Sequence, residues 1–186
     1  MATKKIAVIV GSIRKGSYSK AVAKYVASIA PKDLSFEFVD IANLPLFNQD
    51  YDDENQVPAS WVEFRKTIKD ADGFLFVTPE HNRSFPAALK NALDIASRPY
   101  GQNVWGDKPG AIISVSPGAI AGFGANHQLR QVLVFLNVLT MAQPEAYIGH
   151  ITASLNDKNE VANEGLQKFL KAYVDAFDAW VNRVSK

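Results

Sequence analysis

The 186-residue sequence contains no cysteine, which excludes disulfide bonds, thiol catalysis, thiolate metal sites and a redox-active dithiol. It has no apolar run of the roughly 18 residues that a membrane-spanning helix needs. The run Ile6 to Val10 is too short, and too soon followed by polar residues, for a signal peptide. With 20 lysines and arginines against 19 aspartates and glutamates, the chain lacks the basic excess of a nucleic-acid-binding protein. We therefore expect a cytoplasmic protein in which any anion site is local.

The apolar patterning predicts one α/β domain over residues 1–186. Strand-like and helix-like segments alternate, and no repeat, low-complexity tract or linker separates them. The runs IAVIV, FLFV and AIISV are almost continuously apolar, which is typical of parallel strands buried between two helical layers. The expected strands are 5–10, 35–41, 73–78, 111–116 and 146–149, and the expected helices are 18–29, 59–69, 86–96, 125–138 and 163–184.

Three loops rich in glycine, proline and short polar residues follow the first, third and fourth expected strands. They read GSIRKGSYS from residue 11, PEHNRSFP from residue 79 and SPGAIAGFGAN from residue 116. In a parallel sheet the ligand crevice lies beyond the carboxyl ends of the strands, so these loops are predicted to form one site. The loop NLPLFNQDYDDENQVP from residue 43 is long and acidic, and we expect it to be solvated, in a rim or a subunit contact.

The first loop is suited to hold a phosphate group. Gly11 allows the backbone to turn sharply and approach a ligand, and Ser17 or Ser19 is well placed to open the following helix. A helix N-terminus attracts anions, and hydrogen bonds from Ser12 or Arg14 to a charged group would each add about 1.5–3 kcal/mol. The sequence therefore favours a phosphate at this loop.

The same loop lacks two well-known phosphate-binding motifs. Ser17 and Tyr18 stand where a Walker A motif requires lysine and serine or threonine, and the dinucleotide motif G-x-G-x-x-G is missing. A phosphate monoester held without a metal ion fits better than a nucleoside triphosphate. The alternative is an ordinary turn and helix cap in which Arg14 and Lys15 are solvated.

The second loop lies within TPEHNRSFPAALKNALD, residues 78–94. Its four polar residues end at Pro86, which is suited to begin a helix, so the turn is predicted to be rigid. Main-chain groups held in such a turn can hydrogen-bond the ring nitrogens and carbonyls of a flat heterocycle.

Taken together, GSIRKGSYS, TPEHNRSFPAALKNALD and SPGAIAGFGANHQLRQVL resemble the NAD(P)H-dependent FMN reductase family, particularly its quinone and chromate reductase branch. The resemblance covers residue 5 to about residue 149. It implies a flavodoxin-like three-layer fold with five parallel strands in the order 2-1-3-4-5, non-covalently bound FMN, and a homodimer or homotetramer. Hydride would pass from NADH or NADPH through FMN to quinones, with side activity on chromate, azo compounds or free flavin.

The resemblance also assigns residues to the FMN site. It implies phosphate-binding positions in the first loop, an isoalloxazine-contacting turn in the second loop and further contacts in the third loop. Since FMN carries the chemistry, no protein residue is predicted to be catalytic and no metal site is expected. The predicted FMN-binding residues are Gly11, Ser12, Arg14, Ser17, Ser19, Pro79, Glu80, His81, Asn82, Ser116 and Gly118.

Some positions depart from the family pattern. His81 and His127 stand where tyrosine is common, and Arg83 stands where glycine or tyrosine is usual. We expect Arg83, Arg98 and His127 at the mouth of the site, where a cation would attract the nicotinamide phosphates or an anionic acceptor. A solvated or purely structural position is the alternative for each.

The segment LRQVLVFLNVL, residues 129–139, carries apolar side chains around more than one helical face. A helix packed only on its own sheet needs a single apolar stripe, so we expect a self-association surface here. Burial beneath the last helix is the alternative.

Two other functions suit the same fold. A flavodoxin-type electron carrier would bind FMN without productive turnover of NAD(P)H, but such proteins are usually strongly acidic and this chain is not. A receiver-like module needs an acidic cluster after the first strand and a phosphoacceptor aspartate after the third. Ser12 and Pro79 stand at those places.

Overall fold

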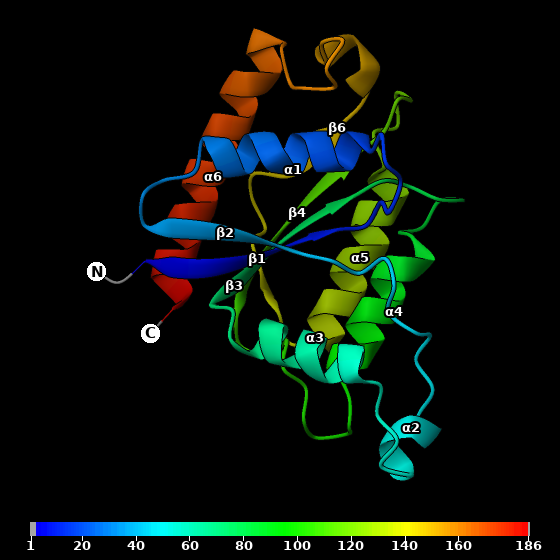
Figure 1. The fold of residues 1–186 in the computed structure, drawn as a ribbon. Helices are drawn as coiled ribbons and strands as arrows, with labels where there is room; N and C mark the ends of the chain where they lie inside the picture. Colours follow the sequence, from blue (N-terminus) through cyan, green and yellow to red (C-terminus); the bar gives the residue numbers. More distant parts are fainter. Residues whose placement is uncertain (1–2, 186) are drawn as a thin grey trace.

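The computed structural model, which describes residues 3–185, has a parallel sheet between two layers of helices (Figure 1). All ten expected helices and strands are present, with boundaries within three residues of those predicted. In chain order the elements are β1 Lys4–Val10, α1 Tyr18–Ser28, β2 Leu34–Val39, α2 Asp50–Asp53, α3 Ala59–Lys69, β3 Gly73–Thr78, α4 Ala87–Ala96, β4 Pro109–Val115, α5 Phe123–Phe135, β5 Leu139–Thr140, β6 Ala146–Ile148, the 3₁₀ helix η1 Ile151–Ser154 and α6 Glu164–Val184.

The strand order is β2-β1-β3-β4-β5 and each pairing is parallel, which confirms the flavodoxin-like arrangement. The fifth position is shared by two short strands. β5 pairs with the start of β4 (Pro109 with Leu139), and β6 pairs with its end (Val115 with Ile148). Sequence patterning predicted only β6. The connection between the two strands contains Pro144, which has no N–H to donate to a ladder.

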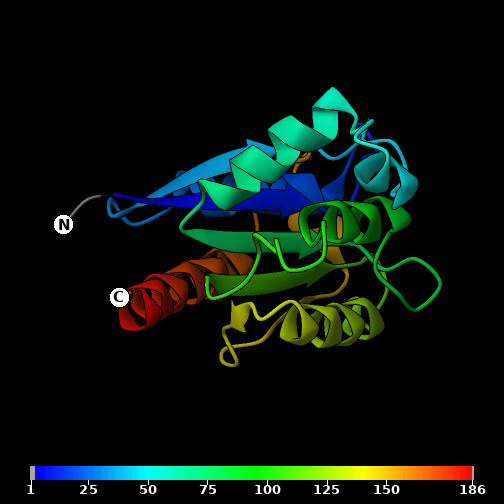
Figure 2. The same cartoon turned by 90° about the horizontal axis from the view of Figure 1, so that it is seen from below.

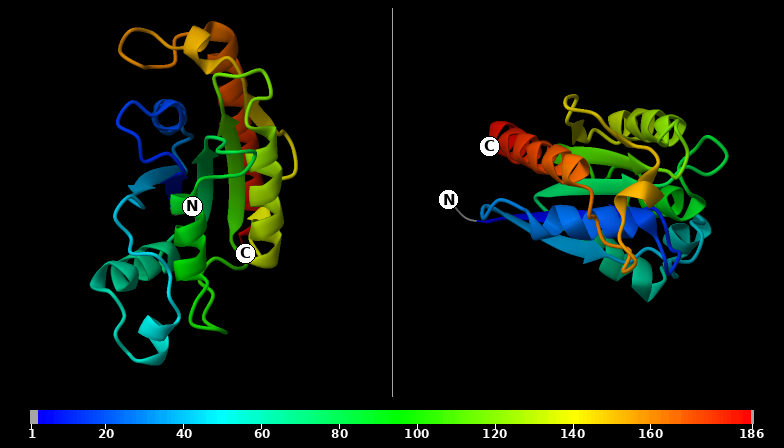
Figure 3. Two further views of the ribbon diagram at one scale, coloured as in Figure 1. Left: turned by 90° about the vertical axis from the view of Figure 1, so that its right-hand side faces the viewer. Right: turned by 90° about the horizontal axis from the view of Figure 1, so that it is seen from above.

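Alternate residues of the central strands face opposite helical layers. On β3, Phe74 and Phe76 pack with α3, α4 and α5, whereas Leu75 and Val77 pack with α1 and α6. Figure 2 shows the sheet from the side of α3, α4 and α5, and the right-hand view of Figure 3 shows it from the side of α1 and α6. Burial of both faces explains why these strands read as continuous apolar runs.

Helix α5 ends three residues before the predicted end. Asn137 has a φ of +59°, the left-handed conformation that terminates helices. The N–H of the next residue, Val138, donates to the carbonyl of Leu133 at 2.9 Å, as in a Schellman motif. The apolar periodicity continues past Leu136 and does not reveal this stop, because Leu136 and Val138 remain buried in the core.

Most residues of the acidic loop after β2 are exposed, as expected, but two half-buried residues, Phe47 and Asp52, contact α3. Arg65 on α3 binds the Asp52 carboxylate through two hydrogen bonds of 2.7 Å, and the Asp52 side chain is only 5% exposed. Phe47 stacks on Trp61 with ring centroids 5.6 Å apart. These two contacts therefore hold an otherwise exposed loop against α3.

Candidate functional site

A cavity of about 580 Å³ opens at the carboxyl edge of the sheet, between the loops that follow β1 and β3. This volume is within the usual range for small-molecule sites. The predicted residues that line it are Gly11, Ser12, Arg14, Ser19, Pro79, Glu80 and His81. The apolar part of the wall was not predicted from the sequence. It is formed by Ile13, Tyr18, Pro86, Ala87, Ala88, Val115 and Pro117. Their only sequence signal is their place in the three loops or at the strand and helix ends next to them.

The loop after β1 presents unpaired donors to this cavity. Gly11 donates to the carbonyl of Val77 at 2.9 Å, and a Cβ on Gly11 would lie 2.9 Å from Thr78 Oγ1, so only glycine fits this approach. Within residues 3–185, the backbone N–H groups of Ser12, Tyr18 and Ser19 donate to no protein acceptor. The last two belong to the first turn of α1, where helical N–H groups favour an anion.

Ser17 and Arg14 have different roles in this loop. Ser17 is the N-cap of α1: its hydroxyl accepts from the N–H of Lys20 at 3.0 Å, and the residue is buried and does not line the cavity. The Arg14 guanidinium hydrogen-bonds the carbonyl of Gly16 and lies 4.9 Å from the centre of the Tyr18 ring. Arg14 therefore offers a cation at the cavity, whereas Ser17 shapes the helix end.

The loop after β3 is a tight turn. His81 and Ser84 exchange two backbone hydrogen bonds of 2.8 and 2.9 Å, and the two residues between them, Asn82 and Arg83, have φ values of +51° and +67°. Positive φ at both central residues is characteristic of type I′ turns, which asparagine and glycine favour. Arg83 is therefore strained. The turn fixes His81 in the cavity wall and directs Asn82 to solvent.

Glu80 connects the second loop to the third. One carboxylate oxygen accepts from the N–H of Ala125 in the first turn of α5 at 3.1 Å, and the other pairs with Arg83 Nη1 at 3.1 Å. Gly124 makes this approach possible, because a Cβ there would lie 2.7 Å from the carbonyl oxygen of Arg83. The only acidic residue of the cavity wall is thus neutralised by its partners.

The third loop contributes Pro117 to the cavity, and the predicted Ser116 and Gly118 lie on either side of it without lining the wall. Ser116 Oγ accepts from the N–H of Gly118 at 3.1 Å. Ala121 and Gly122 have φ values of +57° and +71°, which turn the chain into α5. The loop is therefore shaped largely by its own backbone.

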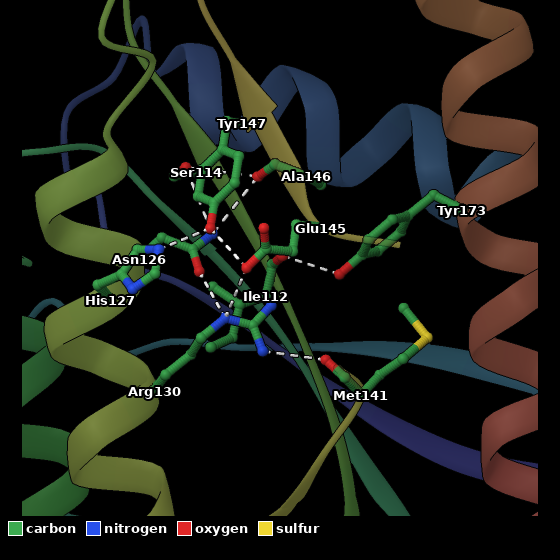
Figure 4. A network of polar contacts seen from close by, with 10 residues as sticks. All are labelled: Ile112, Ser114, Asn126, His127, Arg130, Met141, Glu145, Ala146, Tyr147 and Tyr173. Atoms are coloured by element: carbon green, nitrogen blue, oxygen red, sulfur yellow. Dashed lines mark hydrogen bonds and ion pairs between the residues drawn. The ribbon is translucent and has the colours of Figure 1, made fainter. Parts of the chain in front are cut away.

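His127 belongs to a polar network between α5 and β6 and does not line the cavity (Figure 4). Its Nε2 lies 2.8 Å from the Tyr147 hydroxyl, which donates to Glu145 Oε1 at 2.7 Å. Burial, followed by the hydrogen bond to Glu145, raises the pKa of Tyr147 to about 12. The Phe123 ring packs on His127 with centroids 4.1 Å apart. Sequence analysis found no signal for this network.

Arg130 holds the inner part of the same network, one turn along α5 from Asn126. Its Nε donates to Asn126 Oδ1 and its Nη1 to the carbonyl of Met141, both at 3.0 Å. Glu145 lies 4.0 Å from Arg130 Nε, at the limit of an ion pair. These contacts anchor α5 to the β5–β6 connection (Figure 4).

The other two residues expected at the mouth are far apart. Arg83 lies beside the cavity on the type I′-like turn, with its side chain 68% exposed. Arg98 follows the far end of α4, about 15 Å along the chain from the helix turn that lines the cavity. Arg83 therefore lies near the cavity without lining it, and Arg98 lies at the opposite edge of the sheet.

The cavity as a whole fits FMN. Its first-loop side offers N–H donors, the Ser12 hydroxyl and Arg14 to a phosphate, and its remaining walls are mostly apolar and suit a flat ring. Among residues 3–185 there is no group of three or more histidine, aspartate or glutamate side chains placed to bind a metal ion. The phosphate would thus be held by protein donors.

Comparison with known proteins points in the same direction. Residues 4–153 match the family model described as NADPH-dependent FMN reductase. A quinone reductase of Pseudomonas putida is 53% identical over 176 residues, which cover 95% of this chain and 94% of the relative. A 2-hydroxy-1,4-benzoquinone reductase of Burkholderia sp. is 50% identical over 177 residues, covering 95% and 96%.

A solved structure agrees over nearly the whole chain. The flavoenzyme NAD(P)H:(acceptor) oxidoreductase FerB from Paracoccus denitrificans superposes with a TM-score of 0.92 and 38% identity, covering 99% of this chain and all of FerB. No described helix has the length and apolar character needed to cross a membrane.

Proposed function

Because this chain belongs to the NADPH-dependent FMN reductase family, we propose that it oxidises NAD(P)H and reduces quinones through bound FMN. The observation that carries the proposal is the cavity at the sheet edge, where free N–H donors at the start of α1 face a mostly apolar wall. Bound FMN supplies the hydride-transfer chemistry, and the protein supplies binding, orientation and charge.

Each wall of the cavity has a part in this function. Ser12, Ser19 and the first turn of α1 hold the FMN phosphate, with Arg14 as the neighbouring cation. The rigid turn from His81 presents main-chain groups to the edge of the isoalloxazine. Arg83, exposed beside this turn, attracts the anionic nicotinamide nucleotide. Side activity on chromate, azo compounds or free flavin, and a cytoplasmic location, stay predictions from the sequence.

An anaerobic experiment distinguishes this function from that of an electron carrier. The purified protein should be yellow. Stopped-flow mixing with NADH or NADPH should bleach the flavin absorbance at least as fast as the enzyme turns over in the steady state. Addition of 1,4-benzoquinone should then restore the absorbance. A yellow protein that neither nucleotide bleaches would indicate the flavodoxin-type carrier. A colourless protein that takes up no FMN would exclude both functions.

Self-association through α5 is also part of the proposal. Leu129 and Leu133 are buried against α3 and α4, so the expected alternative of burial beneath the last helix does not apply, because α6 lies on the other face of the sheet. Val134 and Phe135 remain 72% and 82% exposed at the end of the helix. Their exposure supports a contact with a second copy. Light scattering on the purified protein should show a dimer or tetramer, and a strict monomer would refute the contact.

A further inference from the structure

A second cavity, of about 620 Å³, runs along α1 on the other side of the first loop. One wall is the face of α1 that carries Lys20, Lys24 and Tyr25, and the opposite wall is the segment between η1 and α6 around Lys158. In Figure 1 this segment (orange) lies above α1 (blue). This cavity and the FMN cavity share no lining residue. A third hollow shares Lys15 and Lys20 with this cavity and Ser12, Ile13 and Arg14 with the FMN cavity, so the three follow one another around the first loop.

The cavity is strongly cationic. Four of its lining residues are lysines, namely Lys15, Lys20, Lys24 and Lys158, against one acidic residue, Glu160. In the part of the chain that the structure describes, none of the four lysines lies within ion-pair distance of a carboxylate. Elsewhere on the surface Lys90 and Lys171 each pair with an aspartate one helical turn away. An unpaired group of lysines around a hollow favours an anionic ligand.

The wall opposite α1 is preorganised. Asn156 accepts from the N–H groups of Lys158 and Glu160 at 3.0 and 2.9 Å, and its amide donates to the Glu160 carboxylate at 3.1 Å. A bridge between Leu155 and Val161 closes this loop. These bonds fix the backbone at Lys158, which lines the cavity opposite α1, and give the Glu160 carboxylate a hydrogen-bond donor.

The spacing along α1 suits a ligand with more than one phosphate. Lys20 and Lys24 are one helical turn apart on the same face, and the lining residues extend to Ser28, about 12 Å beyond Lys20. The half-buried Tyr25 lines the same cavity and offers a ring on which a base can stack. Ammonium groups around an aromatic ring match a phosphorylated adenosine.

We propose that this lysine cavity binds the adenosine 2′-phosphate half of NADPH and makes NADPH the preferred reductant over NADH. The inference rests on the proposed function, since the nicotinamide must reach the FMN cavity while the adenosine end lies across the first loop among the lysines. NADPH carries an additional phosphate, which the unpaired lysines bind and which NADH lacks. The lysines are binding residues that discriminate between the two nucleotides.

The test measures binding and turnover separately. Isothermal titration of the FMN-loaded protein with adenosine 2′,5′-bisphosphate should show binding at least about tenfold tighter than binding of 5′-AMP. Lys24→Ala and Lys158→Ala should each weaken binding of the bisphosphate by about threefold to tenfold. Each variant should also lower the ratio of kcat/KM for NADPH to kcat/KM for NADH by a similar factor. Lys66→Ala, an exposed lysine of α3 on the other face of the sheet, is the matched control and should change neither quantity.

Several outcomes would overturn the inference. They are equal affinity for the bisphosphate and 5′-AMP, equal affinity for the bisphosphate and inorganic phosphate, and unchanged affinity in both lysine variants. If either nucleotide still bleaches the flavin in that case, the proposed function stands and only the role of the lysine cavity is lost. If neither nucleotide reduces the flavin, the proposed function fails, and the bisphosphate titration still decides whether the cavity binds the nucleotide.

Discussion

The carboxylate of Glu80 and the backbone N–H of Ala125 lie 3.1 Å apart, which joins the loop after β3 to the first turn of α5. This hydrogen bond satisfies one of the free N–H groups at the start of α5, whose N-cap Gly122 has no side chain to do so. Glu80 is 11% exposed and also holds Arg83. Glu80, in the second loop, thus supplies the capping hydrogen bond that Gly122 cannot give to α5, the helix after the third loop.

Removing this cap should destabilise the fold. Glu80→Ala is expected to lower the free energy of unfolding by about 1 kcal/mol, the usual cost of losing an N-cap hydrogen bond, and to weaken FMN binding because the turn loses its anchor. Glu80→Gln keeps an acceptor and should lose less. Urea denaturation and FMN titration of the apoprotein measure both effects. Glu63→Ala, at an exposed position of α3, is the control. An equal loss in Glu63→Ala would contradict the capping role.

The close approach of α5 to the second loop predicts that Gly124 does not tolerate a methyl group. In Gly124→Ala the Cβ would lie 2.7 Å from the carbonyl oxygen of Arg83 and 3.0 Å from Glu80 Oε2. Such overpacking typically costs about 1–3 kcal/mol, measured by urea denaturation. Gly16→Ala is the matched control, because a Cβ at Gly16 meets nothing within 4 Å. The idea would be abandoned if both variants unfolded at the same urea concentration.

Two serines of the first loop are expected to have different effects, Ser17 on the stability of the apoprotein and Ser12 on FMN binding. Ser17 caps α1, so Ser17→Ala should cost the apoprotein about 1 kcal/mol. Ser12 lines the cavity and its hydroxyl forms no described hydrogen bond, so Ser12→Ala should leave apoprotein stability within about 0.5 kcal/mol and weaken FMN binding roughly tenfold. Thermal unfolding of the apoproteins and fluorescence titration with FMN test this. The reverse pattern would mean that the two roles are exchanged.

Ionisation of the Tyr147 phenol should make the free energy of unfolding depend on pH above pH 10. Its pKa is raised from 10.0 to about 12, so between these values the folded protein retains a proton that the unfolded chain loses. The stabilising contribution is complete below pH 10 and declines as the pH rises toward 12. The difference in unfolding free energy between the wild type and Tyr147→Phe should therefore be constant from pH 8 to 10 and shrink above pH 10.

Urea denaturation at a series of pH values measures this difference. Tyr100→Phe is the control, because the Tyr100 side chain is 93% exposed and forms no described hydrogen bond through its hydroxyl. A difference between wild type and Tyr147→Phe that stayed flat to pH 11 would show that neither burial nor the hydrogen bond to Glu145 raises the pKa of the phenol.

Most of the site was predictable in outline because the parallel sheet gathers the carboxyl ends of its strands at one edge. Gly11, Ser12 and His81 were predicted at that edge and line the cavity. The direction in which each loop side chain points was less predictable. Ser17 or Ser19 was expected to open α1, and both were also predicted to bind FMN. Ser17 caps α1 and does not line the cavity, since an N-cap hydroxyl points back at its own helix.

Arg98 shows the limit of argument from position in a motif. It follows the predicted helix closely in sequence, but a helix carries the chain about 1.5 Å per residue away from its start, so Arg98 lies at the opposite edge. His127 was also expected at the mouth. It instead binds Tyr147, which is 20 residues later in the chain and reaches it only because β6 pairs beside the end of β4.

Local periodicity in the sequence was sufficient for the strands, the helices, their layered order and the three loops, because these depend on which residues are apolar and how far apart they lie. The contacts between loops, such as Glu80 with Ala125, the network around Arg130 and the lysine cavity along α1, were decided by the tertiary structure. They join residues that are distant in sequence, and a side chain's partner depends on backbone direction and packing, which no local pattern encodes.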